Sequence, residues 1–194
     1  MSHVTLALVV ALCVTLSAAA QQEWAFPHTK KSGRATSEYR DDNGFHVVVN
    51  YDYSQRNHKT PWLLIDMALA ATRRFVLHKD NIRLVTPDGR ELRVATQEAM
   101  IADSQGITFV VQNAKIFRQP LENYFSQRGG RESIRFQVLP GQGTTSDEAV
   151  VDNDRVALGA VFFRSPEGLW QSATYRLVID NEKAKAALPI VLSY

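Results

Sequence analysis

His46, Asn50, Asp52 and His58 are the side chains whose types and spacing could bind a metal ion. The first three differ by even numbers within a run of alternating residues, so they would stand on one face of a β-strand. His58 follows on a polar loop. Zinc and copper sites use three or four His, Cys or carboxylate ligands. We therefore keep His46 and His58 as candidate residues of a metal carrier, and otherwise expect no cofactor.

Asp66 is the carboxylate with the most unusual surroundings, because it interrupts the apolar run of residues 62–70 (WLLIDMALA). A buried carboxylate requires a cationic or hydrogen-bonding partner. We expect a structural ion pair with Arg73 or Arg74. A catalytic acid is the alternative role for this residue.

A hydrolase would need a serine whose hydroxyl group lies beside a histidine base. The chain has no G-x-S-x-G motif, and no motif pairs a serine with His28, His46, His58 or His78. We therefore assign no catalytic residue. An extracytoplasmic hydrolase with unassigned residues stays as the alternative function.

Large aromatic side chains are the remaining group with binding chemistry. They are more numerous than one strand face requires, and several of them exposed side by side would form a patch for a partner. We name Trp62, Trp170 and Tyr124 as the residues of this binding surface. Its partner would be a protein or an envelope ligand.

The first twenty residues have the composition of a secretory signal peptide. They contain no Lys, Arg, Asp or Glu and end in three alanines, residues 18–20. A short apolar core followed by small residues is typical of a cleaved export signal. We predict cleavage after Ala20 and a periplasmic or secreted location. An uncleaved anchor would need ~20 predominantly apolar residues, and Thr5, Thr15 and Ser17 interrupt this run. We predict no membrane span in the mature chain.

Cysteine and charge content exclude several classes of function. The one cysteine, Cys13, lies within the predicted signal peptide, so the mature chain has no disulfide, thiolate nucleophile or cysteine metal site. The 22 Lys and Arg residues nearly balance the 20 Asp and Glu residues, which leaves a net charge of +2. This balance provides no broad attraction to nucleic acid, and we expect no nucleic-acid partner.

Short strands separated by turn residues follow Gly44. Alternation predicts a strand over residues 45–53, and the apolar runs at 62–70 and 107–114 predict two more. Residues 84–94 (LVTPDGRELRV) read as a hairpin, with Pro87 to Gly89 at the turn. One short helix is expected near residues 120–128, where proline comes first and glycine ends the run.

These elements predict a mainly β protein, an antiparallel immunoglobulin-like β-sandwich of about eight or nine strands with one short helix. The expected organisation is a signal peptide at 1–20, an extended or flexible N-terminal segment at 21–43, and a single sandwich domain at 44–194. Such a module would bind through a sheet edge or through the loops at one end.

The stretch ALGAVFFRSPEGLWQSATYRLVIDN, residues 157–181, resembles the end of uncharacterised exported immunoglobulin-like domains of bacteria. In those domains a strand, a turn and a strand complete the sandwich. The resemblance implies a fold and carries no functional residue. Together with the predicted signal peptide, it leads to the expectation of an exported, non-enzymatic binding or accessory module. The hydrolase and, less favoured, the metal carrier are the alternatives.

Overall fold

The computed structural model describes residues 26–125 and 129–193. The predicted signal peptide and its cleavage site lie outside these ranges. Twelve strands lie within them, so the mainly β class is confirmed and the strand number is larger than the eight or nine expected. Several strands are three or four residues long, which is too short for alternation to reveal them. In the described ranges, no helix combines the length and the apolar composition needed to cross a bilayer.

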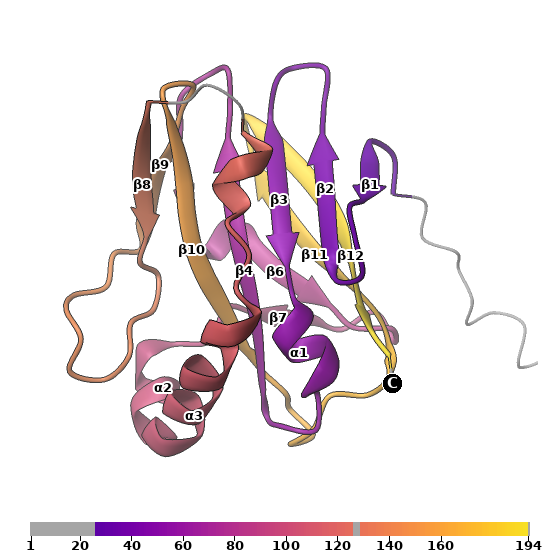
Figure 1. Cartoon of the computed structure of the whole chain (residues 1–194), viewed down its shortest axis with the longest axis vertical. Coiled ribbons are helices and arrows are strands. Elements are labelled where there is room, and N and C mark those ends of the chain that lie inside the picture. The colour runs from indigo at the N-terminus through magenta and orange to yellow at the C-terminus, as the bar shows by residue number, and fades with distance from the viewer. Residues whose placement is uncertain (1–25, 126–128, 194) are drawn as a thin grey trace, which may run out of the picture.

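The larger of the two main sheets has six strands, in the order β1-β2-β3-β4-β10-β8 (Figure 1). Their bounds are β1 Thr29–Lys31, β2 Thr36–Arg40, β3 His46–Asn50, β4 Trp62–Ala70, β10 Arg155–Arg164 and β8 Gly130–Ile134. All neighbours are antiparallel except β8 and β10, which run parallel. The expectation of a purely antiparallel protein is therefore wrong at this edge. A parallel pair requires a long connection, and residues 135–154 supply it.

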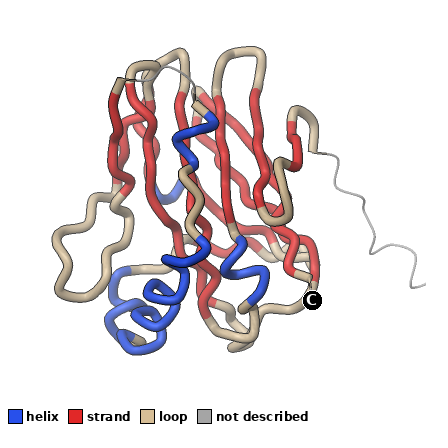
Figure 2. Tube along the Cα trace, in the orientation of Figure 1, coloured by secondary structure: helices blue, strands red, loops and turns tan. Residues whose placement is uncertain are grey.

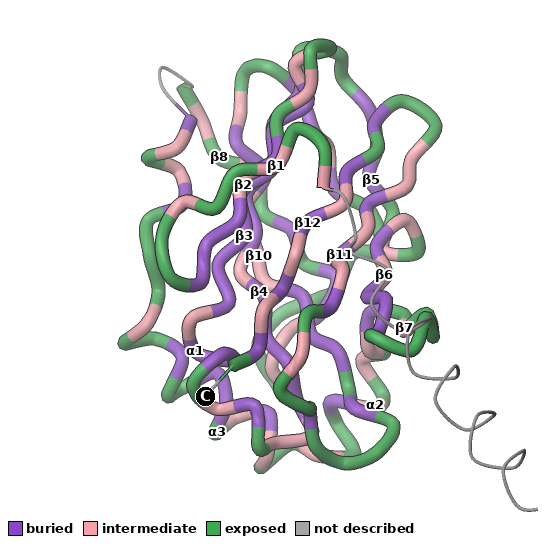
Figure 3. Tube along the Cα trace, turned by 90° about the vertical axis from the view of Figure 1, so that its right-hand side faces the viewer, coloured by how far each residue is buried: buried purple, intermediate pink, exposed green. Residues whose placement is uncertain are grey.

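The second main sheet has four strands, in the order β12-β11-β6-β7, and a two-stranded sheet pairs β5 with β9. Their bounds are β12 Ala184–Leu192, β11 Ala173–Asn181, β6 Ile82–Val85, β7 Glu91–Arg93, β5 Phe75–His78 and β9 Glu148–Val151. The two main sheets pack face to face. Figure 3 shows that buried positions follow the strands and that exposed positions gather in the connections.

The main core lies between the two sheets, but the larger sheet is buried on its outer face as well. From β4, Leu63, Ile65, Met67 and Leu69 point into the main core. Trp62, Leu64, Ala68 and Ala70 of the same strand belong to two smaller clusters on the outer face. Burial on both faces explains why residues 62–70 form a nearly continuous apolar run rather than an alternating one.

Helices cover parts of this outer face (Figure 2). The α-helices are α1 Asp52–Arg56, α2 Gln97–Ala102 and α3 Ser104–Ala114. The 3₁₀ turns are η2 Lys79–Asn81, η3 Lys115–Phe117 and η4 Leu121–Tyr124. The helix expected near 120–128 is thus the single turn η4, and residues 126–128 lie outside the described ranges. The strand expected over 45–53 ends at Asn50, because α1 begins two residues later.

The strand expected over residues 107–114 is wrong, because this segment forms α3. Asp103 caps the helix by accepting a hydrogen bond from the Gly106 N–H at 3.2 Å. Ile107, Val110, Val111 and Ala114 are its buried residues and recur at helical spacing. A short run of β-branched residues has the same composition in a buried strand and in a buried helix face, so composition alone does not separate them.

The folded unit begins before the Gly44 boundary expected from the sequence, because β1 and β2 both belong to the large sheet. Side chains from this region also reach the edge of β12. Thr29 Oγ1 donates to the Ala187 carbonyl at 3.1 Å, and Ser37 Oγ donates to the Pro189 carbonyl at 2.9 Å. Side-chain hydrogen bonds therefore join the two sheets along one side of the molecule.

The hairpin expected at residues 84–94 is confirmed by the pairing of β6 with β7. The Thr86 N–H donates to the Arg90 carbonyl at 2.9 Å, and Gly89 adopts a φ of 87°, a value that favours glycine. Arg90 also forms an ion pair with Glu167 at 2.6 Å. This contact attaches the hairpin tip to the turn that follows β10.

Candidate ligand-binding groove

Residues 115–125, here called the strap, lead from the end of α3 across the outer face of the large sheet to η4 (Figure 1). At the α3 end, Trp62, Leu64 and Phe162 of the sheet pack against the helices. At the η4 end, the strap residues Leu121 and Phe125 pack on a second set of sheet residues: Val48, Ala68, Ala70 and Val156. Between these two apolar clusters, a strip of sheet surface lies open beneath the strap.

Asp66 and Ala160 face each other across β4 and β10 in this strip. Asp66 carries a charge and Ala160 has a small side chain, so neither provides the apolar bulk that would pack the strap down. Two adjoining pockets result, and Arg118 and Ala160 line both of them. We call the pair of pockets the groove.

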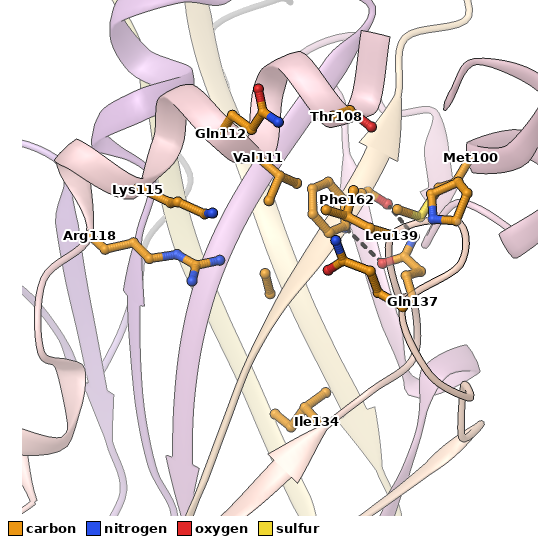
Figure 4. Close-up of a pocket in the computed structure, with 13 residues that line it drawn as sticks. Met100, Thr108, Val111, Gln112, Lys115, Arg118, Ile134, Gln137, Leu139 and Phe162 are labelled. Atoms are coloured by element: carbon orange, nitrogen blue, oxygen red, sulfur yellow. Dashed lines mark hydrogen bonds between the residues drawn. The ribbon is translucent and has the colours of Figure 1, made fainter. Parts of the chain in front are cut away.

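The first pocket, here called the helix pocket, is a cavity of about 350 Å³ between α3, the strap and the connection after β8. Its apolar lining includes Val111, Leu139 and Phe162. Figure 4 shows the side chains of Lys115 and Arg118 pointing into it from the side that faces Leu139 and Phe162. The described residues that line this pocket include these two cations and no carboxylate.

The second pocket, here called the strap pocket, is a cavity of about 250 Å³ with charged walls of both signs. Asp66 lines it from the sheet, Glu122 from η4 and Arg131 from β8. Arg131 and Glu122 neutralise each other through an ion pair of 2.6 Å. Arg118 stands between the two pockets, so its guanidinium group is shared by them.

Asp66 is largely buried, with 16% of its side chain exposed, and its nearest cation is Arg118, whose Nε lies 3.8 Å from Oδ1. No residue of the described ranges donates a hydrogen bond to this carboxylate. Burial therefore raises its pKa to about 6, and the positive charge of Arg118 lowers it only in part. The expected partners Arg73 and Arg74 are exposed instead, so that pairing is wrong.

Lys115 and Arg118 keep most of their capacity to bind an anion. The Arg118 side chain is 48% exposed, and its contact with Asp66 is longer than a hydrogen bond. Within residues 26–125 and 129–193, no carboxylate lies within ion-pair distance of Lys115. The helix pocket is consequently the positively charged end of the groove.

Two glutamine side chains hold the wall opposite α3. The Gln137 amide donates to the Ala95 carbonyl at 2.6 Å and to the Phe162 carbonyl at 3.2 Å, and it accepts from the Phe162 N–H at 3.0 Å. Gln97 donates to the Val138 carbonyl at 2.8 Å and accepts from its N–H at 3.1 Å. The two amides substitute for strand pairing where β8 has ended, so this wall is held in place without a ligand.

A polar row anchors the strap to the sheet beside Asp66. Asn50 pairs with Asp66 across β3 and β4, and Thr36 pairs with Asn50 across β2 and β3. Asn50 Nδ2 donates to Thr36 Oγ1 at 3.1 Å, and the Thr36 hydroxyl donates to Gln119 Oε1 of the strap at 3.4 Å. The strap is therefore tied down at its middle by polar contacts and at its η4 end by apolar ones.

The candidate metal residues make other contacts. His46 Nε2 lies 2.9 Å from Glu38 Oε1, and its ring centre lies 4.3 Å from that of Phe125. His58 Nδ1 lies 2.9 Å from the Gln55 carbonyl oxygen. Both histidines are buried. In the part of the chain that the structure describes, no group of three His, Cys, Asp or Glu side chains could hold a metal ion.

The expected aromatic surface does not form, because both tryptophans are interior residues. Trp62 is 1% exposed and donates from Nε1 to Asp103 at 2.7 Å. Trp170 is 4% exposed and donates to the Pro61 carbonyl at 3.3 Å. Tyr124 is half-buried and donates to the Ser32 carbonyl at 3.4 Å. Each indole nitrogen has a partner in the fold, as buried tryptophans usually do.

Sequence reasoning singled out Asp66 but missed Lys115, Arg118 and Gln137. Lys115 directly follows α3 and Arg118 has extended backbone after η3, so no helical spacing relates the two cations. Only the helix that precedes them has a sequence signal, the cap at Asp103. Gln137 has no sequence signal, because its partners come from two distant segments.

Comparisons of the chain with models of known protein families, with curated proteins and with solved structures find no match. The resemblance to exported immunoglobulin-like domains therefore stays a prediction. The case for a function depends on the geometry of the groove.

Proposed function

We propose that the protein is an exported, non-enzymatic binding module with an immunoglobulin-like sandwich as its framework, and that its ligand occupies the groove. The observation that carries this proposal is the groove itself. Its walls are held by Gln97, Gln137 and the anchored strap. Among the described residues, Lys115 has no carboxylate within ion-pair distance, and Arg118 contacts Asp66 only at 3.8 Å, so both cations keep capacity for an anion. Ligand sites are typically concave, largely preformed and apolar with a few polar groups in fixed positions.

The composition of the lining supports binding rather than nucleophilic catalysis. Among the described residues that line the two pockets, there is no serine, cysteine or histidine. Acyl transfer by a serine or cysteine needs the nucleophile and its base side by side. The predicted signal peptide supports action outside the cytoplasm, where an accessory module would meet an envelope ligand.

Ala160→Phe tests the role of the groove, because residue 160 lines both pockets and a phenyl ring there would fill the space between them. We would screen a panel of small molecules by thermal unfolding of the purified protein. We expect at least one compound to raise the melting temperature of the native protein and to lose that effect in Ala160→Phe. Thr174→Phe, at an exposed position of β11, is the matched control and should keep the response.

Two results would contradict the proposed function. One is a panel in which no compound stabilises the native protein. The other is a compound that stabilises Ala160→Phe as strongly as the native protein, since its site would then lie elsewhere.

The raised pKa of Asp66 is the observation that favours the alternative, an extracytoplasmic hydrolase. A carboxyl group with a pKa of about 6 in a cleft has the properties of a general acid. Turnover of ester, glycan or peptide substrates by the native protein, lost in Asp66→Asn, would replace the binding proposal with this one. We expect no turnover by either protein.

A further inference from the structure

The helix pocket has one sign of charge and one apolar wall, and this combination specifies a class of ligand. Lys115 and Arg118 extend into it from the strap (Figure 4). Val111, Leu139 and Phe162 supply the apolar lining. A ligand with an anionic head and an apolar body would contact both the two cations and the apolar lining.

We infer that the helix pocket binds a small organic acid, with its carboxylate on Lys115 and Arg118 and its apolar body against Val111, Leu139 and Phe162. This inference rests on the proposed function and names its ligand class. The planar guanidinium group of Arg118 can donate two parallel hydrogen bonds to one carboxylate, whereas Lys115 adds a point charge.

The strap pocket restricts the ligand to a single acid group. Asp66 and Glu122 line it beyond Arg118. Because Arg131 neutralises Glu122 there, a second carboxylate that extended past Arg118 would meet the Asp66 carboxylate and lose affinity through like-charge repulsion. The groove therefore disfavours a dicarboxylate long enough to span both pockets.

The size of the helix pocket agrees with a small molecule. Its volume of about 350 Å³ lies near the lower end of the range of roughly 300–1,000 Å³ for ligand pockets. A medium-chain acid fits this range, and octanoate is a suitable probe. The residues on its two walls come from α3, the strap, β10 and the connection after β8, all of which are held by the contacts described above.

Isothermal titration of the purified protein tests the inference with four probes at about pH 7.5 and low salt. Octanoate carries both features, octanol lacks the charge, octylammonium reverses it and acetate lacks the apolar body. We expect octanoate to bind, octanol and acetate to bind at least about tenfold more weakly, and octylammonium to give no heat of binding.

Two substitutions test whether the carboxylate of the ligand contacts Arg118 and Lys115. We expect Arg118→Gln and Lys115→Gln each to weaken octanoate binding about tenfold, because each removes a charge-assisted hydrogen bond. Arg118→Lys keeps the charge and should retain part of the affinity. Arg93→Gln, at an exposed position of β7 on the other sheet, is the matched control and should bind like the native protein. Equal melting temperatures of the variants would show that the strap is intact.

The ligand class is overturned if octylammonium or octanol binds as tightly as octanoate, if none of the probes binds, or if both glutamine variants bind octanoate like the native protein. These failures differ from a failure of the proposed function. A neutral or cationic compound that stabilises the native protein and not Ala160→Phe would refute the acid ligand and keep the groove as a binding site.

Discussion

The carboxylate of Asp66 governs the electrostatics of the groove. It faces Arg118 of the strap, and Glu122 of η4 and Arg131 of β8 line the same pocket. Burial raises its pKa from the ordinary value of 3.8 to about 6. The folded protein therefore holds a proton at Asp66 more tightly than the unfolded chain does. This contribution to stability is present at low pH and is lost as the pH rises through about 6.

We expect Asp66→Asn to raise the free energy of unfolding at about pH 7.5 by about 1–3 kcal/mol, because the substitution removes a buried charge. The gain should vanish below about pH 4, where Asp66 is protonated in both states. Urea unfolding across this pH range measures it. Asp42→Asn, at an exposed position, should change stability by less than about 0.5 kcal/mol. A loss of stability in Asp66→Asn at neutral pH would show that attraction to Arg118 outweighs burial.

Asp66 should also oppose the binding of an acid next to it. In the native protein, we expect the affinity for octanoate to rise about fivefold as the pH is lowered from about 7.5 to about 6, because protonation removes a neighbouring negative charge. Asp66→Asn should bind with the higher affinity at both pH values. Calorimetric titrations of the two proteins measure this difference. The same pH dependence in both proteins would assign the effect to another group.

For single residues, the sequence predicted the burial of Asp66 but did not identify its ion-pair partner. A single carboxylate in an apolar run predicts a buried charge, and the structure confirms the burial. The partner Arg118 reaches it from the strap, which lies far along the chain, so proximity in sequence favoured Arg73 and Arg74 instead. Trp62 and Trp170 show the same limit, because aromatic content does not tell core residues from surface residues.

Among the elements, the connection after β8 is held in position by two single side chains, Gln97 and Gln137. β8 ends at Ile134, while β10 continues to Arg164. On that side the Phe162 carbonyl accepts from the Ala95 N–H at 2.8 Å, and the Phe162 N–H has the Gln137 amide as its partner. A side chain stands here where a neighbouring strand would otherwise pair with β10. It fills less space than a strand, and the helix pocket lies in the remaining space.

We expect Gln137→Ala to lower the free energy of unfolding by about 2 kcal/mol, because it leaves the Phe162 N–H and the Ala95 carbonyl without their partner. Urea unfolding measures the loss. Gln142→Ala lies in the same connection at an exposed position and should change stability by less than about 0.5 kcal/mol. Equal effects of the two substitutions would show that water replaces the Gln137 amide without cost.

Strands and turns with a clear residue pattern could be predicted from the sequence. The secondary structure of a segment that depends on its tertiary contacts could not. The strand at 62–70 and the hairpin at 84–94 are confirmed, because apolar composition and turn residues agree there with the fold. Residues 107–111 carry the β-branched and aromatic residues typical of strands. Their helical state depends on the Asp103 cap and on contact with Trp62 and Leu64 of β4.

For the whole molecule, the unequal burial of the two sheets decides where the groove can form. The larger sheet has a core on each face, and the groove lies in the gap between the two covering clusters of its outer face. We expected a binding site at a sheet edge or at the end loops, as in many sandwich modules. The mainly β class could be predicted from strand patterns, whereas the groove joins residues 66, 118 and 160, whose meeting depends on the complete topology.

The side-chain hydrogen bonds that join the two sheets at β12, here called the joint, provide a test of the whole fold. Ser37 is fully buried, and its hydroxyl donates to the Pro189 carbonyl. We expect Ser37→Ala to lower the free energy of unfolding by about 1–2 kcal/mol, because the partly buried Pro189 carbonyl loses its donor. Amide hydrogen exchange in β12 should speed up in parallel. Ser172→Ala, at an exposed position, is the control, and an equally small effect of both substitutions would mean that this joint does not stabilise the fold.

The same joint bears on how the protein behaves at high concentration. An edge strand with available carbonyls is a template on which another chain can add a strand. Along β12, Thr29, Ser37 and Gln55 of the same chain donate to the carbonyls of Ala187, Pro189 and Val191. Pro189 also has no N–H to offer to an incoming strand. The fold thus protects this edge against aggregation by strand addition at high protein concentration.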